Sequence, residues 1–277
     1  MKQIFKKTFL KLKGDKLLKQ INKTPRVLFW HGVDNIVDNE VEAESFDVDV
    51  FRSHINYLAN NFEIISIDEF HKRFKDNNFT HNEIVLTFDD GYSNNLNTVA
   101  PILNKKSLPF TVFISTEHIE TGTLFPTSIA RLIILGSELK SISVPSIDIN
   151  KVSIAMNNSK ANIYSYVSSK LKSKPLVDVR KIVSDLINNL SETQYTDLIE
   201  KYKSVKPMTW DEVVRIHQLG ATIGSHCKYH ICCHAAQDDN EVKEQIFDSK
   251  RIIEDKLNDE CRYFAYPNGN YTDNSNF

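Results

Sequence analysis

The chain has 277 residues, of which 41% are hydrophobic and 25% are charged, with a formal net charge of -2. This length suffices for one large domain or two small ones, and the composition is that of an ordinary soluble globular protein. The near-neutral charge balance offers no electrostatic basis for binding nucleic acid, so we expect no nucleic-acid partner.

A basic segment, residues 1–24, precedes the predicted domain, which we place at residues 25–277. Its lysines surround several leucine and phenylalanine residues, and only Asp15 opposes them. Two interpretations stay open. The segment 1–21 can form an interfacial helix on an anionic membrane, or a helix whose lysine face is simply solvated.

The chain contains no apolar run long enough for a signal peptide or a membrane span. Its four cysteines (Cys227, Cys232, Cys233 and Cys261) form no CxxC pair and have no zinc-finger spacing. We therefore expect the thiols to be reduced and the protein to be cytoplasmic. The alternative location is the inner membrane face, where the protein would bind peripherally.

Short β-rich runs alternate with helical patterns, which is typical of parallel strands joined by crossover helices in an α/β fold. The predicted strands are 26–31, 62–67, 83–89, 110–115, 221–226 and 262–267, and the predicted helices are 48–60, 68–76, 94–106, 209–219 and 239–258. The helix 209–219 has the clearest limits, because Thr209 and Glu212 form a capping box and Gly220 suits the C-terminal cap.

The stretch of about 120–205 is rich in Ser, Lys, Asn and Ile and has little strand signal. A structureless loop of this length is uncommon inside a compact domain. We therefore expect a helical insertion between two barrel strands, which forms a wall or lid over the site.

Two adjacent carboxylates, Asp89 and Asp90, follow the predicted strand 83–89. In a parallel α/β fold, catalytic groups gather where strands end at their carboxyl side. Neighbouring carboxylates repel unless a positive charge neutralises them, and a bound cation does so. Gly91 permits the sharp turn that this needs. The alternative is an ordinary Asp-Asp-Gly turn before a helix.

Four further residues are candidates because of their places beside predicted strands. His226 and His230 have the four-residue spacing that lets two imidazoles bind one metal ion, although this spacing also arises by chance. His31 ends the first strand and can exchange a proton near neutral pH, or it is a structural histidine. Arg262 leads the last strand, where it can hold a carboxylate ionised or lie at the surface.

One aspartate and two histidines make a three-ligand metal site with open positions for water and substrate. The second aspartate then remains free as a base. A metal-bound water has a pKa of about 7, and the metal polarises the carbonyl under attack. This set of residues favours hydrolysis of an amide or an ester.

Three motifs, TFDDGY (87–92), IGSHCKYH (223–230) and RYFAYPNG (262–269), resemble in this order those of the polysaccharide deacetylases with a NodB-homology domain, carbohydrate esterase family 4. The flanking stretches LFWHGV and MTWDEVVRIHQLGATIGSH agree, and the resemblance covers nearly all of the chain outside 120–205. It implies a distorted, incomplete (β/α) TIM-like barrel. It also implies hydrolysis of N-acetyl groups on an N-acetylated saccharide, with a divalent metal, usually zinc.

The resemblance assigns roles by position. Asp89 would be the general base, and Arg262 would orient it. The metal ligands would be Asp90, His226 and His230.

The same resemblance implies substrate contacts. Tyr92 would direct a backbone N–H toward the developing oxyanion. The strand with Tyr266, Pro267 and Asn268 would line the acetyl pocket.

Two departures from the family pattern bear on the mechanism. Cys227 stands where the family usually has Ser or Thr. The chain ends eight residues after Gly269, before any Leu-x-His motif, so the domain is expected to be short at its C-terminus. Circularly permuted poly-N-acetylglucosamine deacetylases carry their histidine early, in a Tyr-His-x-Val-like motif that residues 30–33 resemble. We therefore assign His31 as the general acid.

The leading hypothesis is an N-deacetylase that acts on an N-acetylated sugar or polysaccharide such as a surface-glycan precursor. One alternative is a non-catalytic carbohydrate-binding protein with a truncated barrel, and another is an O-acetyl esterase. We expect substrate choice to depend on the loops 32–46 and 120–205.

Overall fold

The structure, a computed structural model, describes residues 25–268 except residues 37, 81 and 235. The basic segment 1–24, for which membrane association is an expectation, lies outside the described residues. Among the helices that are described, none has the length and apolar character needed to cross a membrane.

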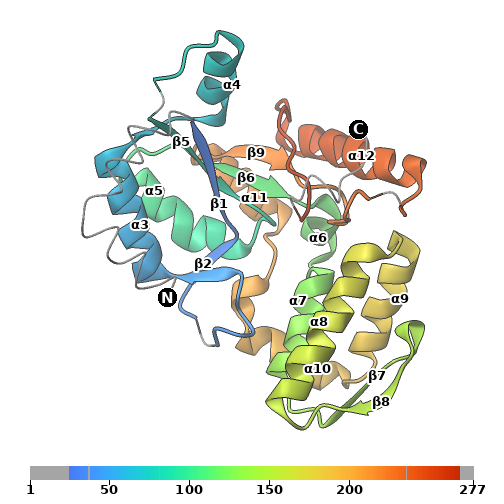
Figure 1. The fold of residues 1–277 in the computed structure, drawn as a ribbon. Helices are drawn as coiled ribbons and strands as arrows, with labels where there is room; N and C mark the ends of the chain where they lie inside the picture. Colours follow the sequence, from blue (N-terminus) through green and yellow to red (C-terminus); the bar gives the residue numbers. More distant parts are fainter. Residues whose placement is uncertain (1–24, 37, 81, 235, 269–277) are drawn as a thin grey trace.

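A five-stranded parallel sheet forms the centre of the fold (Figure 1). The strands run in the order β1-β5-β6-β9, and β4 pairs with the beginning of β5. β5 is buried at every residue, which is typical of a central parallel strand. The strands are β1 (Arg26–Trp30), β4 (Glu63–Ile64), β5 (Glu83–Phe88), β6 (Thr111–Ile114) and β9 (Thr222–Ser225).

Helices connect the strands as the alternating pattern predicts. In α11 the Thr209 side chain accepts from the Glu212 N–H and the Glu212 side chain accepts from the Thr209 N–H, so the predicted capping box is confirmed. The predicted helix 94–106 consists of a π-helical turn, η1, followed by α5. The helices are α3 (Val48–Asn61), α4 (Ile67–Lys75), η1 (Asn95–Val99), α5 (Ala100–Asn104), α6 (Thr116–Thr121), α11 (Trp210–Gln218) and α12 (Asp239–Leu257).

Within the described residues the sheet stays open, with β1 and β9 as its two edges. Alternate side chains of a strand point to opposite faces. Leu28 and Trp30 of β1 therefore pack into the hydrophobic core, while Val27 and Phe29 are 50% and 63% exposed on the other face. A closed barrel would cover those two side chains. The sheet face that carries Val27 and Phe29, which would be the inner face of a closed barrel, is thus exposed to solvent.

The predicted last strand, 262–267, is not a regular strand in the structure. It is reduced to a single parallel bridge between Ser225 and Phe264. The Ser225 N–H donates to the Tyr263 carbonyl and the Ala265 N–H donates to the Ser225 carbonyl. These two bonds place the segment beside β9.

The stretch between α6 and α11 forms a lobe beside the sheet (Figure 1). Helices make up most of it, but it also contains an antiparallel hairpin, β7–β8, which the sequence analysis did not anticipate. A small parallel pair, β2–β3, lies elsewhere, after β1. The elements are β2 (Gly32–Asp34), β3 (Ser45–Asp47), α7 (Pro126–Arg131), η2 (Leu132–Gly136), β7 (Ser141–Val144), η3 (Pro145–Ile147), β8 (Ile149–Ser153), α8 (Asn157–Ser173), α9 (Leu176–Ile187), α10 (Glu192–Lys201) and η4 (Lys203–Val205).

The lobe shares its hydrophobic core with the loop that follows β9. Ile133 and Ile182 of the lobe belong to the same buried cluster as Cys227, Tyr229 and Ile231 of that loop. Burial of these side chains removes apolar surface from water and so ties the lobe to the segment that carries His226 and His230.

Glu83 at the start of β5 leads to a prediction on acid stability. Its carboxylate accepts from the Thr80 and Asn82 N–H groups and from Arg73 Nη1. Burial acts to raise the pKa of Glu83, but the Thr80 bonds and Arg73 bring it down to about 2. The ionised group therefore stabilises the fold above its unfolded pKa of 4.5, and this contribution is lost as pH falls toward 2.

We expect Glu83→Gln to lower the free energy of unfolding at pH 6.5 and to have a smaller effect at pH 3. Urea unfolding of both proteins at the two pH values measures this difference. An equal difference at both pH values would contradict the assigned role of the charge.

Candidate active site

A cleft of about 940 Å³ extends from the inner face of the sheet to the carboxyl ends of its strands. His31 follows β1, Asp89 and Asp90 follow β5, and His226 follows β9, and all of them line this cleft together with His230. Residues separated by up to about 200 positions thus meet at the end of the sheet where barrel enzymes place their catalytic groups.

Asp90, His226 and His230 converge on one point. Asp90 Oδ1 lies 3.1 Å from His230 Nε2 and 3.6 Å from His226 Nε2, and the three ligand atoms lie within 4.8 Å of one another. All three side chains are largely buried, and no described residue makes a well-formed hydrogen bond to Asp90 Oδ1. A buried carboxylate oxygen without a partner, beside two imidazole nitrogens, fits the ligand set of a divalent metal ion.

Left-handed backbone conformations place these ligands. The φ angles of Asp90 and His230 are 72° and 53°, which are uncommon for non-glycine residues. Gly91 has φ 69°, and a Cβ there would lie only 2.7 Å from Ile114 Cγ2. The turn after β5 therefore needs glycine both for its conformation and for close packing. Such conformations often persist at functional sites.

Hydrogen bonds to the surrounding structure orient the histidine loop. His226 Nδ1 donates to the Ala265 carbonyl at 2.8 Å, because a carbonyl can only accept. This leaves the Nε2 lone pair of His226 directed toward Asp90, as is typical of a metal-binding histidine whose other ring nitrogen is held by a backbone carbonyl. The Tyr229 N–H donates to Gln245 Oε1 of α12 at 2.7 Å, which fixes the loop just before His230.

The environment separates the two aspartates electrostatically. Burial raises the pKa of Asp89 to about 6. Burial also acts to raise the pKa of Asp90, but the positive charge of His230 holds it below its usual range. Burial lowers the pKa of His226 to about 3, so its imidazole is neutral at pH 7. Neighbouring carboxylates with divergent pKa values are typical of a base and a metal ligand.

His31 reaches the cleft from the opposite edge of the sheet to His226. β1, which precedes His31, and β9, which precedes His226, are the two edge strands, so the two histidines approach Asp89 from different directions. Asn95 Nδ2 donates to the His31 carbonyl at 2.8 Å, and the imidazole packs edge-on against Phe29. The structure therefore places His31 across the site from the predicted ligands.

The backbone N–H of Tyr92 is not used in the local pairing. Tyr92 forms an antiparallel bridge with Pro207 in which the Gly91 carbonyl accepts and the Ser93 N–H donates. In such a pair the Tyr92 N–H points away from the bridge partner. Tyr92 is fully buried and does not line the cleft. A contact between its N–H and the substrate therefore stays a prediction.

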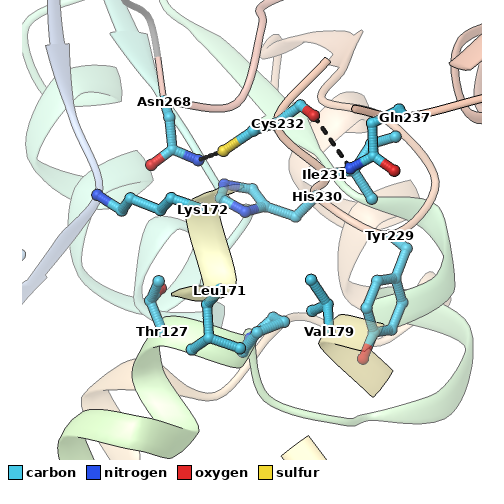
Figure 2. Close-up of a pocket in the computed structure, with 11 residues that line it drawn as sticks. Thr127, Leu171, Lys172, Val179, Tyr229, His230, Ile231, Cys232, Gln237 and Asn268 are labelled. Atoms are coloured by element: carbon cyan, nitrogen blue, oxygen red, sulfur yellow. Dashed lines mark hydrogen bonds between the residues drawn. The ribbon is translucent and has the colours of Figure 1, made fainter. Parts of the chain in front are cut away.

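The predicted substrate residues differ in position. Tyr266 and Asn268 line the cleft, and Pro267 is buried. Asn268 also lines a smaller neighbouring pocket, where its Nδ2 donates to Cys232 Sγ at 2.8 Å (Figure 2). Lys172 of α8 lines both spaces.

Arg262 does not reach Asp89 in the structure, contrary to the sequence-based expectation. Its Nη2 lies 3.0 Å from Asp68 Oδ1 and its Nε lies 3.5 Å from Glu260 Oε2. The side chain is 52% exposed and does not line the cleft. Because residues before Phe264 do not continue a strand into the sheet, Arg262 faces α4, and Asp68 there neutralises its charge.

Cys227 and Cys233 are both buried and their sulfur atoms are 3.8 Å apart. All four cysteines are free thiols. The Cys227 thiol therefore fills the position of the family's usual hydroxyl by packing into the core behind the histidine loop.

Glu44, Thr127 and Lys172 also line the cleft, although the sequence analysis did not single them out. Glu44 lies in the turn before β3, inside the loop 32–46 for which we expected a role in substrate choice. These residues belong to no recognisable motif, and their place in the cleft wall becomes evident only in the folded structure.

The open parallel sheet, with its polar site at the strand ends, defines a hydrolase of the incomplete (β/α)-barrel class. A family model described as polysaccharide deacetylase matches residues 76–173 and 182–276, and the chain belongs to this family. The predicted family, fold class and type of enzyme, a carbohydrate deacetylase, are thereby confirmed.

Solved structures of deacetylases have a similar fold. The Streptococcus pyogenes deacetylase PplD in complex with acetate is 16% identical with a TM-score of 0.53, over 91% of this chain and 78% of that chain. A de-N-acetylase from Aggregatibacter actinomycetemcomitans is 16% identical with a TM-score of 0.50, over 90% and 81%. IcaB from Ammonifex degensii is 11% identical with a TM-score of 0.50, over 90% and 78%. Comparison with curated proteins yielded no match.

Proposed function

We propose that this deacetylase removes N-acetyl groups from an N-acetylated sugar or polysaccharide with the help of a divalent metal ion. The observation that carries the proposal is the convergence of Asp90, His226 and His230 directly beside a separate, half-buried carboxylate, Asp89. Exposed aromatic side chains, Phe29 and Tyr266, offer flat surfaces to a saccharide in the same cleft.

Asp90, His226 and His230 would hold the metal ion, for which zinc is the expected identity because it favours nitrogen and oxygen ligands in this number. When bound, a divalent cation supplies Lewis-acid chemistry: it lowers the pKa of a water molecule and polarises the acetyl carbonyl. The neutral state of His226 suits this role, since a protonated imidazole cannot bind a metal.

Asp89 acts as the general base. It takes a proton from the water molecule as the water oxygen forms a bond to the acetyl carbon. A pKa near 6 suits this task at neutral pH, because the carboxylate is ionised yet still basic. The Tyr92 N–H donates to the oxygen atom that becomes negative in the tetrahedral species.

His31 acts as the general acid. As the carbon–nitrogen bond breaks, its imidazolium gives a proton to the sugar nitrogen, and the products are acetate and a free amine. Asn268 and Tyr266 line the wall of the acetyl pocket, and the buried Pro267 lies between them in the chain. Arg262 has no part in this scheme because it binds Asp68.

Metal removal provides the first test. We expect the purified protein to release acetate from N-acetylglucosamine oligomers, to lose that activity on dialysis against a chelator, and to regain it when zinc is added. Metal content measured in parallel should fall and recover with the activity.

Two results would contradict the proposal. Activity that survives complete metal removal would exclude the metal-dependent mechanism. Failure of the metal-loaded protein to release acetate from any N-acetylated saccharide would favour the non-catalytic binding protein, and release from O-acetylated saccharides alone would favour the esterase.

A further inference from the structure

A carboxylate with no role in the mechanism above lies in the wall of the cleft. Glu44 lines the same space as Asp89, Asp90 and His31, and its side chain is 29% exposed. It belongs to the turn between β2, which begins just after His31, and β3.

Arg131 of α7 holds this carboxylate in place. Arg131 Nη2 lies 2.5 Å from Glu44 Oε1, and the arginine side chain is only 6% exposed. Arg131 Nε donates to the Tyr164 hydroxyl of α8 at 3.1 Å, and the guanidinium lies 5.7 Å from the centroid of the Tyr164 ring. A buried cation fixed by two helices restricts its anionic partner, so Glu44 is held in one orientation.

The other carboxylate oxygen of Glu44 has spare capacity to accept hydrogen bonds. An ionised carboxylate offers about four acceptor positions. Glu44 Oε1 is bound by Arg131, whereas among the described residues Oε2 makes only a 3.5 Å contact with the Tyr92 hydroxyl, which is long for a hydrogen bond. A donor that enters the cleft can therefore bind to Oε2.

We propose that Glu44 is a specificity-determining residue that accepts hydrogen bonds from hydroxyl groups of the saccharide, and that Arg131 positions it. This inference rests on the proposed function and names a contact for the sugar rather than for its acetyl group. A carboxylate can only accept, and a sugar ring offers several O–H donors. Sites built to bind a hydroxyl group select strongly for substrates that have it.

The lobe thereby gains a role in substrate recognition. α7 and α8 supply Arg131 and Tyr164, and neither residue itself lines the cleft. Besides lining the cleft with Thr127 and Lys172, the lobe therefore acts on the substrate through the orientation of Glu44.

Steady-state kinetics with N-acetylglucosamine oligomers test this inference. For Glu44→Gln we expect KM to rise about tenfold while kcat changes less than about threefold, because the neutral amide is a weaker hydrogen-bond acceptor than the carboxylate. The control is Glu117→Gln, which breaks a more exposed Glu–Arg pair, with Arg180, outside the cleft and should leave KM unchanged.

Loss of the Glu44 charge leaves Arg131 buried without its anion, which by itself lowers stability. The double variant Glu44→Gln/Arg131→Met removes both charges. We expect it to recover Tm toward the wild-type value and to keep the raised KM, which a purely structural role for the pair would not produce.

The outcomes separate this inference from the proposed function. If the metal-loaded wild-type protein releases no acetate from any N-acetylated saccharide, the proposed function is wrong and the inference with it. If the wild type is active but KM of Glu44→Gln stays unchanged, only the inference is wrong. The inference is equally wrong if the double variant regains both Tm and the wild-type KM.

Discussion

Replacement of Asp89 by asparagine is expected to lower kcat for acetate release by about 10²–10⁴-fold, the usual contribution of a general base. Asparagine has nearly the same shape as aspartate but cannot accept the proton of the attacking water. Asp89 is not one of the three converging ligand residues, so bound metal should remain at the wild-type level. Acetate release and metal content, measured on the same preparation, check both expectations.

Asp68→Asn is the matched control for this experiment. Asp68 pairs with Arg262 and accepts from the Tyr263 hydroxyl, outside the cleft. We expect this variant to retain kcat within about twofold, since surface ion pairs contribute little. A fully active Asp89→Asn variant would show that another group is the base, and loss of metal from it would show that Asp89 is a ligand.

Replacement of His226 by alanine is expected to weaken metal binding by more than about 100-fold. Loss of a group that only hydrogen-bonds to a metal ligand already lowers metal affinity by about 10–100-fold. Only two ligand side chains, Asp90 and His230, would remain. Acetate release should fall to background at low metal concentration. Titration of the wild type and the variant with zinc, monitored by metal content and by acetate release, gives the zinc affinity of each protein.

His234→Ala supplies the control, because His226, His230 and His234 follow one another at four-residue intervals in the sequence. Only the first two contribute to the group around Asp90, while His234 Nδ1 accepts from the Ala236 N–H. We expect His234→Ala to bind metal and release acetate like the wild type. Equal loss in both variants would indicate that the loop, rather than the ligand set, had been disrupted.

Much of the fold could be predicted because its signals are local. The strands around 26–31, 83–89 and 110–115 are short apolar runs, and helix 209–219 carries its own capping box. Periodicity and capping depend on residues a few positions apart, and such patterns survive in the folded chain.

The prediction failed where a segment depends on a distant partner. The residues 262–267 have the composition of a strand, yet only Phe264 forms a bridge to β9. The hairpin β7–β8 exists because Ile142, Val144 and Ile149 are buried in the core of the lobe, a packing that local composition does not reveal. Strand formation depends on such neighbours more than helix formation does.

The ligand and base candidates could be found in the sequence alone, because Asp89, Asp90, His226 and His230 stand in two short motifs at strand ends, and strand ends meet at one edge of a parallel sheet. The pairing of charges, in contrast, became clear only from the folded chain. Arg262 was expected at Asp89, but it is bound by Asp68, while Arg131 holds Glu44 from 87 positions away. Electrostatic interactions and hydrogen bonds depend on distances of a few ångströms, and for residues far apart in the chain only the packing of the folded protein sets those distances.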